Sequence, residues 1–182
     1  MGYDLSVHVN EINDNIVPQW ISEIRKFNMN VEIHPEFSFH THSGFLPFKV
    51  VIYDCPNKEL NNLELLTGYE LYVNTMEKKR DEKSIISRLF SKKDRLNSIE
   101  RKIKNANIEI IFNISAQDSF EFRIGWFSAA SLAFICNGVL IDPQEDLKLE
   151  GNQLIRHAHH TVLEDEKLIQ QEDWRIHRFE GW

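Results

Sequence analysis

Histidines are the residues whose spacing in this chain could support chemistry. Six of the eight histidines fall into two groups that lie far apart in the sequence. On a strand, His40 and His42 would point to the same face, and two imidazoles at that spacing can bind one metal ion. His157 or His159 from the second group would then supply a third ligand. This set would form a zinc-type or iron-type site with two or three histidine ligands, and zinc is the candidate cofactor.

Other residues could also complete this candidate metal site. The further candidates, either as ligands or as a base that activates water, are His34, Glu36, Asp54 and His160. A metal ion beside a carboxylate would make the chain a metal-dependent hydrolase, which is our second hypothesis for its function. The chain has no HExxH motif, and the hydroxyl residues around the first histidine group are typical of an exposed polar loop. We therefore favour an exposed polar loop over a metal site for this first group of histidines.

Nucleophilic catalysis has weaker support in the sequence. Cys55 and Cys136 form no CxxC pair, and Cys136 lies in an apolar stretch where a small core residue is expected. The chain has no GxSxG motif, and its seven glycines form neither a dinucleotide-binding nor a phosphate-binding loop. We therefore predict no catalytic residue, and the cysteine usage favours a reducing cytoplasm.

Charge is distributed unevenly along the chain. The formal net charge is −7, but residues 77–104 contain eleven Lys and Arg against five Asp and Glu, so the rest of the chain carries −13. An acidic body of this kind attracts a basic protein partner and disfavours nucleic acid and anionic membranes. The acidic residues that we expect to be exposed and to bind this partner are Asp142, Glu145, Asp146, Glu164, Asp165 and Glu166.

Three aromatic residues are candidate anchors for the same partner. They are Tyr72, Trp174 and Trp182, and core packing is the alternative role, which we favour for Trp174. Neutralising Glu145 and Asp146 is expected to slow association with a basic protein, because these acids would contribute to electrostatic steering.

The basic segment, residues 77–104, differs in composition from the rest of the chain. Its cations could contact phosphates, but Phe90 is its one aromatic residue, and it also carries acids. A solvated helical excursion is therefore favoured over nucleic-acid binding. Leu96, Ile99 and Ile103 are spaced as one helical stripe, which predicts a helix near the end of this segment.

The remaining elements follow from the periodicity of apolar residues. Period-two alternation and short apolar runs predict strands within residues 3–10, 31–33, 45–53, 69–73, 108–114 and 139–141. A helix is predicted over residues 18–27, because Trp20, Ile21, Ile24 and Phe27 share one stripe after Pro18. Short connections between the strands favour antiparallel neighbours.

A buried helix is predicted after Asp118. Asp118 and Glu121 have the spacing of a capping box, and the Ala-rich stretch that follows is apolar nearly all round, with Gly138 expected in the left-handed position at its end. The alternative is a strand over residues 120–124. Strand, helix and strand would form a crossover unit, and residues 3–33 would form another.

The fold class that follows is an α/β (α+β) two-layer sandwich with a mixed, mostly antiparallel sheet and a buried Ala-rich helix. Residues 1–182 are expected to form a single domain, because a typical domain has roughly 100 to 200 residues. No stretch reaches the roughly 18 apolar residues of a membrane span, so we expect a soluble, cytoplasmic protein.

Three blocks of the sequence resemble a family of small, mostly uncharacterised bacterial α/β proteins. The blocks are residues 44–49, residues 68–72, and the stretch from Ala129 through Asn137 to Gln144. Some members of this group are proposed to be immunity proteins of polymorphic or contact-dependent toxin systems. The resemblance implies a fold and a toxin-neutralising role but no catalytic residues. A non-catalytic binding protein is therefore our first hypothesis.

Overall fold

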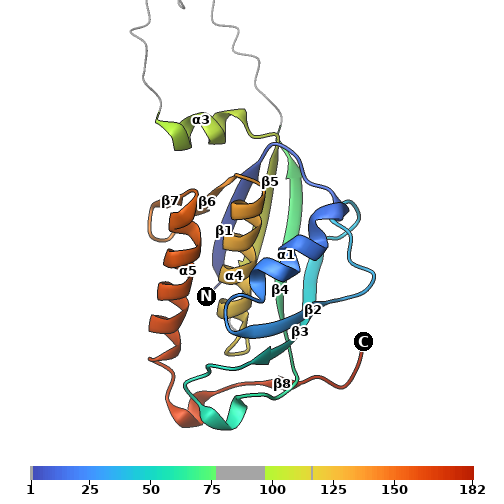
Figure 1. Cartoon of the computed structure of the whole chain (residues 1–182), viewed down its shortest axis with the longest axis vertical. Coiled ribbons are helices and arrows are strands. Elements are labelled where there is room, and N and C mark those ends of the chain that lie inside the picture. The colour runs from blue at the N-terminus through green and yellow to red at the C-terminus, as the bar shows by residue number, and fades with distance from the viewer. Residues whose placement is uncertain (1, 77–96, 116) are drawn as a thin grey trace, which may run out of the picture.

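The protein is an α/β two-layer sandwich (Figure 1). The computed structural model describes residues 2–76, 97–115 and 117–182. The strands are β1 (Tyr3–Val9), β2 (Met29–Ile33), β3 (Gly44–Ile52), β4 (Leu65–Thr75), β5 (Ile108–Ile114), β6 (Val139–Asp142), β7 (Leu147–Leu149) and β8 (His177–Arg178). The α-helices are α1 (Val17–Ile24), α3 (Ser98–Asn105), α4 (Glu121–Ile135) and α5 (Asn152–Glu166). Short 3-10 helices cover Asp14–Ile16, Lys58–Leu60 and Gln171–Asp173.

All the described strands belong to one sheet. Its order is β2-β3-β4-β5-β1-β6-β7, with β8 paired to β4, and every pair is antiparallel. Because β5 and β6 both pair antiparallel with β1, they run parallel to each other, and α4 connects them. The predicted strand–helix–strand unit is therefore present, with β1 between its two strands.

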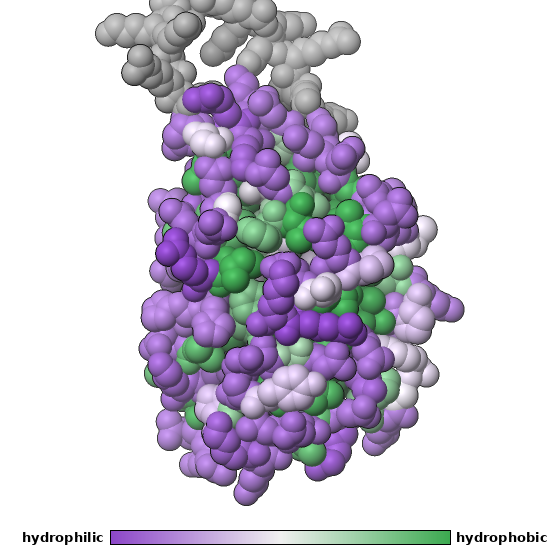
Figure 2. Space-filling model, in the orientation of Figure 1, coloured by the Kyte–Doolittle hydropathy of each residue, from purple (hydrophilic) through white to green (hydrophobic). Residues whose placement is uncertain are grey.

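Helix α4 is the centre of the helical layer. It contacts β1, β4, β5 and β6 on the sheet and has α1 and α5 as neighbours (Figure 1). Twelve of its fifteen residues are buried, which confirms the predicted Ala-rich core helix. The indole Nε1 of Trp20 in α1 donates to the Ser128 carbonyl of α4 at 2.8 Å, and the rings of Phe27 and Phe127 stack with centroids 3.9 Å apart. These contacts fix α1 against α4. Figure 2 shows that this side of the molecule is mostly hydrophilic, with separate apolar patches.

Both ends of α4 differ in detail from the prediction. The helix begins at Glu121, and Phe120 is its N-cap residue. The predicted partners still interact, because the Phe120 amide donates to Asp118 at 2.7 Å and the Asp118 amide donates to Glu121 at 3.4 Å. The prediction for Gly138 was wrong: Asn137 holds the left-handed backbone, with φ of 50°. A Cβ at Gly138 would lie 2.7 Å from the His8 carbonyl oxygen, so a close strand contact requires glycine there.

Residues 77–96 of the predicted basic excursion lie outside the described residues. The end of that segment forms α3, where Ile99 and Ile103 lie on the predicted stripe and are half-buried. Asn97 and Glu100 make a capping box at its start. Helix α3 contacts β1 and β6 at one end of the sheet.

Candidate functional site

The two histidine groups are placed on different elements. His40 and His42 lie in the loop between β2 and β3, in agreement with the favoured loop interpretation, so they do not share the strand face that the metal hypothesis required. The loop turns because Asp14 binds the Ser38 hydroxyl at 2.7 Å and the Phe39 amide at 2.8 Å. His40 is exposed there, as expected for a polar loop.

The second histidine group lies on α5, which packs against α4. The His157 ring lies 5.5 Å from the Trp126 ring, and the His159 ring lies 6.3 Å from the Phe27 ring. Burial lowers the pKa of His157. His157 is therefore half-buried against Trp126, whereas His159 is exposed at the surface of α5.

One part of the predicted ligand set does come together. His34, Glu36 and His42 line a cavity of about 400 Å³ beside β3. The Nε2 of His42 lies 3.0 Å from the Gly44 carbonyl oxygen, and the Nδ1 of His34 lies 3.3 Å from the Glu36 amide. Within residues 2–76, 97–115 and 117–182, no three His, Cys, Asp or Glu side chains converge as metal ligands do.

Two of the acids expected on the surface are buried, so their predicted exposure was wrong. Asp142 has no exposed surface, because its carboxylate accepts hydrogen bonds from the Tyr3 hydroxyl and from the Gln144 and Glu145 amides. Burial and this carboxylate raise the pKa of Tyr3. Glu166 is 1% exposed and pairs with Arg123. Asp142 and Glu166 organise the interior and are closed to a partner.

The other four predicted acids are spread over two elements. Glu145 and Asp146 are exposed in the turn between β6 and β7. Glu164 is exposed near the end of α5 and pairs with Lys167 at 2.6 Å. Asp165 is half-buried, and burial raises its pKa. The predicted set therefore does not form one acidic surface.

The candidate aromatic anchors also have distinct environments. Trp174 is half-buried, and its ring lies 5.3 Å from that of Phe120, in agreement with the preferred packing role. Trp182 is 47% exposed beside His34. Tyr72 lies on β4 and donates from its hydroxyl to Glu70 at 2.9 Å, which raises the pKa of Tyr72.

Tyr72 belongs to a sheet surface that the sequence did not reveal, which we call the acidic sheet face. Its central members are Asp4, Ser6, Glu70, Tyr72, Glu109, Ile111, Asn113 and Ile141. Neighbouring residues along these strands, such as Leu5 and Phe112, are buried in the core. Because side chains alternate along a strand, the acidic sheet face lies opposite α4.

Strand register arranges this face in rows. Tyr72, Ile111, Ser6 and Ile141 are directly paired across β4, β5, β1 and β6. A second row pairs Glu70 with Asn113 and Asp4, and a third pairs Asn74 with Glu109 and His8. A mainly apolar row is thus flanked on both sides by carboxylates.

The groove over the acidic sheet face has a volume of about 520 Å³. Among the described residues that line it there are three acids and no lysine or arginine, which gives a formal charge of −3. Asn113 holds one carboxylate in place by donating to Asp4 at 2.6 Å. The apolar side chains of this face are half-buried. A concentrated negative field beside partly exposed apolar side chains suits a basic, partly apolar protein surface.

Asp4, Glu70 and Glu109 were missed because they come from three strands that are distant in sequence. The alternation along residues 3–10 already implied that Ser6 and His8 share one face of a strand. Which strands lie beside that face depends on sheet order and register, and these are tertiary properties.

Comparison with protein-family models, with curated protein sequences and with solved structures found no match to this chain. None of the helices in the described part of the chain is long and apolar enough to cross a membrane.

Proposed function

We propose that this protein is a non-catalytic binding protein of the bacterial cytoplasm that neutralises a basic protein toxin by docking it on the acidic sheet face. The observation that carries the proposal is the groove lined by Asp4, Glu70 and Glu109 around an apolar row that contains Tyr72 and Ile111. The carboxylates would steer the partner, and the apolar row would supply contact area that loses water on docking.

Association kinetics with a panel of purified basic nuclease toxin domains test this proposal, using partners with isoelectric points above about 9. The Asp4→Asn, Glu70→Gln variant should slow association three- to tenfold at low salt, because steering raises on-rates by about 10-fold or more. Tyr72→Ala should mainly speed dissociation. Glu59→Gln, Glu180→Gln removes the same charge from exposed positions outside the groove and serves as the matched control.

Two results would overturn the proposal. One is that no panel member binds with a Kd below about 10 μM at low salt. The other is that the control variant slows association as much as the variant in the groove. A parallel measurement on Glu145→Gln, Asp146→Asn shows whether the turn between β6 and β7 contributes to steering, as the sequence suggested.

A further inference from the structure

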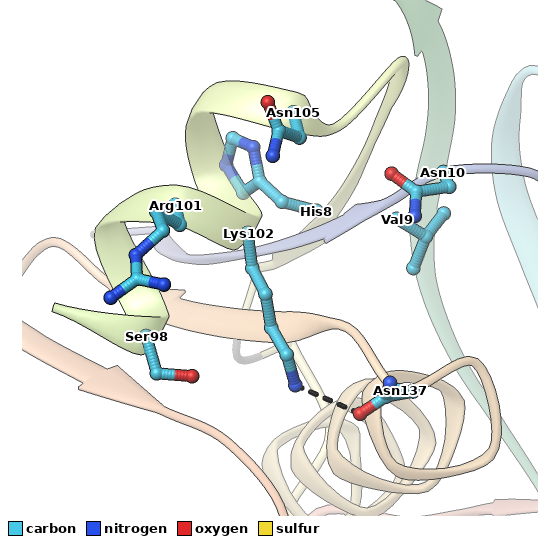
Figure 3. Close-up of a pocket in the computed structure, with 8 residues that line it drawn as sticks. All are labelled: His8, Val9, Asn10, Ser98, Arg101, Lys102, Asn105 and Asn137. Carbon is cyan, nitrogen blue, oxygen red and sulfur yellow. Dashed lines mark hydrogen bonds between the residues drawn. The ribbon is translucent and has the colours of Figure 1, made fainter. Parts of the chain in front are cut away.

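A second cavity, of about 230 Å³, lies at the end of the sheet beneath α3 (Figure 3). Its walls come from the end of β1, from α3 and from the turn between α4 and β6. The polar residues that line it are His8, Asn10, Ser98, Arg101, Lys102, Asn105 and Asn137. The four from α3 have the spacing of one helix face, next to the stripe of Ile99 and Ile103.

The lining has the chemistry of an oxyanion site. Arg101 and Lys102 are cationic, the asparagines carry amide donors, and no Asp or Glu is among the described residues that line the cavity. The Lys102 ammonium is held in place by the Asn137 side-chain oxygen and by Glu150, each at 2.8 Å. Guanidinium, ammonium and amide groups are the donors that proteins use for phosphate and carboxylate.

An independent observation comes from His8. Its side chain projects from β1 toward α3 (Figure 3) and is 7% exposed. Nε2 lies 3.2 Å from the Ser6 hydroxyl and 3.6 Å from Glu109, but Nδ1 is buried and has no hydrogen-bond partner within the described residues. Leaving a buried polar atom without a partner is costly, so a hydrogen-bond donor that reaches this nitrogen would be stabilised there.

The two nitrogens of His8 indicate which anion fits. Burial lowers the pKa of His8, so the ring is neutral at neutral pH. With its one proton on Nε2, facing Ser6 and Glu109, Nδ1 presents a lone pair and needs a donor. Carboxylate and sulfate can only accept hydrogen bonds at this pH, whereas a singly protonated phosphate group both accepts from cations and donates from its hydroxyl.

We propose that the cavity formed by His8, α3 and Asn137 binds a phosphate group that retains one proton. The cationic side chains bind its charged oxygens, and its hydroxyl donates to Nδ1 of His8. The group could be free phosphate or the end of a small phosphomonoester. His8 pairs with Glu109 across β1 and β5, so this cavity borders the acidic sheet face. The two proposals rest on different contacts, and either one can fail without the other.

Calorimetric titration of the full chain with inorganic phosphate, sulfate and glycerol phosphate tests the site. Phosphate should bind saturably and at least about tenfold more tightly than sulfate, since one good hydrogen bond is worth about that factor. The ¹⁵N resonance of His8 Nδ1 should shift with phosphate and not with sulfate. Tighter binding of glycerol phosphate would identify a phosphomonoester, and binding of inorganic phosphate alone would identify free phosphate.

Variants separate this site from general attraction between charges. His8→Phe should abolish the preference for phosphate over sulfate, and Lys102→Met should weaken both anions about tenfold. Lys26→Met removes an exposed lysine of the loop after α1, and it should change neither the binding of phosphate nor the binding of sulfate. Equal binding of phosphate and sulfate by the unmodified chain, or no saturation by about 10 mM phosphate, would overturn the proposal. Because both results come from the unmodified chain, a variant that fails to fold does not obscure the outcome.

Discussion

The guanidinium of Arg123 and the carboxylate of Glu166 form a two-pronged ion pair between α4 and α5. The Nε–Oε1 and Nη2–Oε2 distances are 2.6 and 2.7 Å, and both side chains are 1% exposed. The remaining Nη1 donates to Asp54 at 2.9 Å. The network joins α4, α5 and the segment after β3 deep in the molecule.

Removing one partner of this pair should be costly. Arg123→Leu leaves the Glu166 carboxylate buried without its cation, so the free energy of unfolding in urea should fall by about 3–5 kcal/mol. The double variant Arg123→Leu, Glu166→Leu should lose less, because the fully buried carboxylate is removed together with its cation, and Asp54, which also loses Arg123, is 28% exposed. Lys167→Leu breaks the exposed pair with Glu164 and should cost less than about 1 kcal/mol. A double variant less stable than Arg123→Leu would contradict this account.

Asp118 should make stability depend on pH. Burial raises the pKa of this carboxyl to about 6 from its usual 3.8, although the Phe120 amide and Thr67 hydroxyl bind it. The folded state therefore holds the proton more tightly than the unfolded chain. The stabilisation is complete below pH 3.8 and is lost as the pH rises through 6, a difference of roughly 3 kcal/mol.

Urea unfolding between pH 3.5 and pH 7 measures this effect. Because the amide introduced by Asp118→Asn does not titrate, the stability of the unmodified chain should decline relative to the variant over this range. Parallel curves for the two proteins would show that Asp118 ionises normally in the folded state.

Two glycines should differ in how well alanine is tolerated. A Cβ at Gly68 would lie 2.3 Å from the backbone oxygen of Leu46, whereas a Cβ at Gly125 would lie 2.5 Å from the side-chain Cδ1 of Ile114. A side chain can move or be shortened, but a paired strand cannot. Gly68→Ala should therefore cost more than the roughly 1–3 kcal/mol expected for Gly125→Ala.

Shortening the neighbour provides the control for this pair. Ile114→Val should recover part of the stability lost in Gly125→Ala, because it removes the clashing Cδ1 atom. For Gly68 no truncation of a side chain removes the backbone clash. Thermal unfolding of the single and double variants gives the comparison, and equal losses for the two glycine variants would refute the explanation.

Metal content tests the hydrolase hypothesis directly. We expect protein purified without an affinity tag to contain far less than one equivalent of zinc, iron or manganese, because His40 and His42 lie in a loop and His157 packs on Trp126. Elemental analysis measures this. Near-stoichiometric metal that is lost in His40→Ala, His42→Ala would reinstate the metal site.

Local patterns were sufficient for most of the elements. Alternation along residues 3–10 predicted β1, the stripe of Trp20, Ile21 and Ile24 predicted α1, and the apolar run after Asp118 predicted α4. These predictions succeed because a strand or helix buries one face at a fixed period, and the period can be read directly from neighbouring residues.

Tertiary structure decided which acidic side chains are buried and which of them share one surface. Asp142 and Glu166 were expected outside and lie inside, because Tyr3 and Arg123, both distant in sequence, supply their hydrogen bonds. The acidic sheet face arises because β1, β4 and β5 become neighbours in one register. Burial of a charge depends on its partner in space, and no local period encodes that partner.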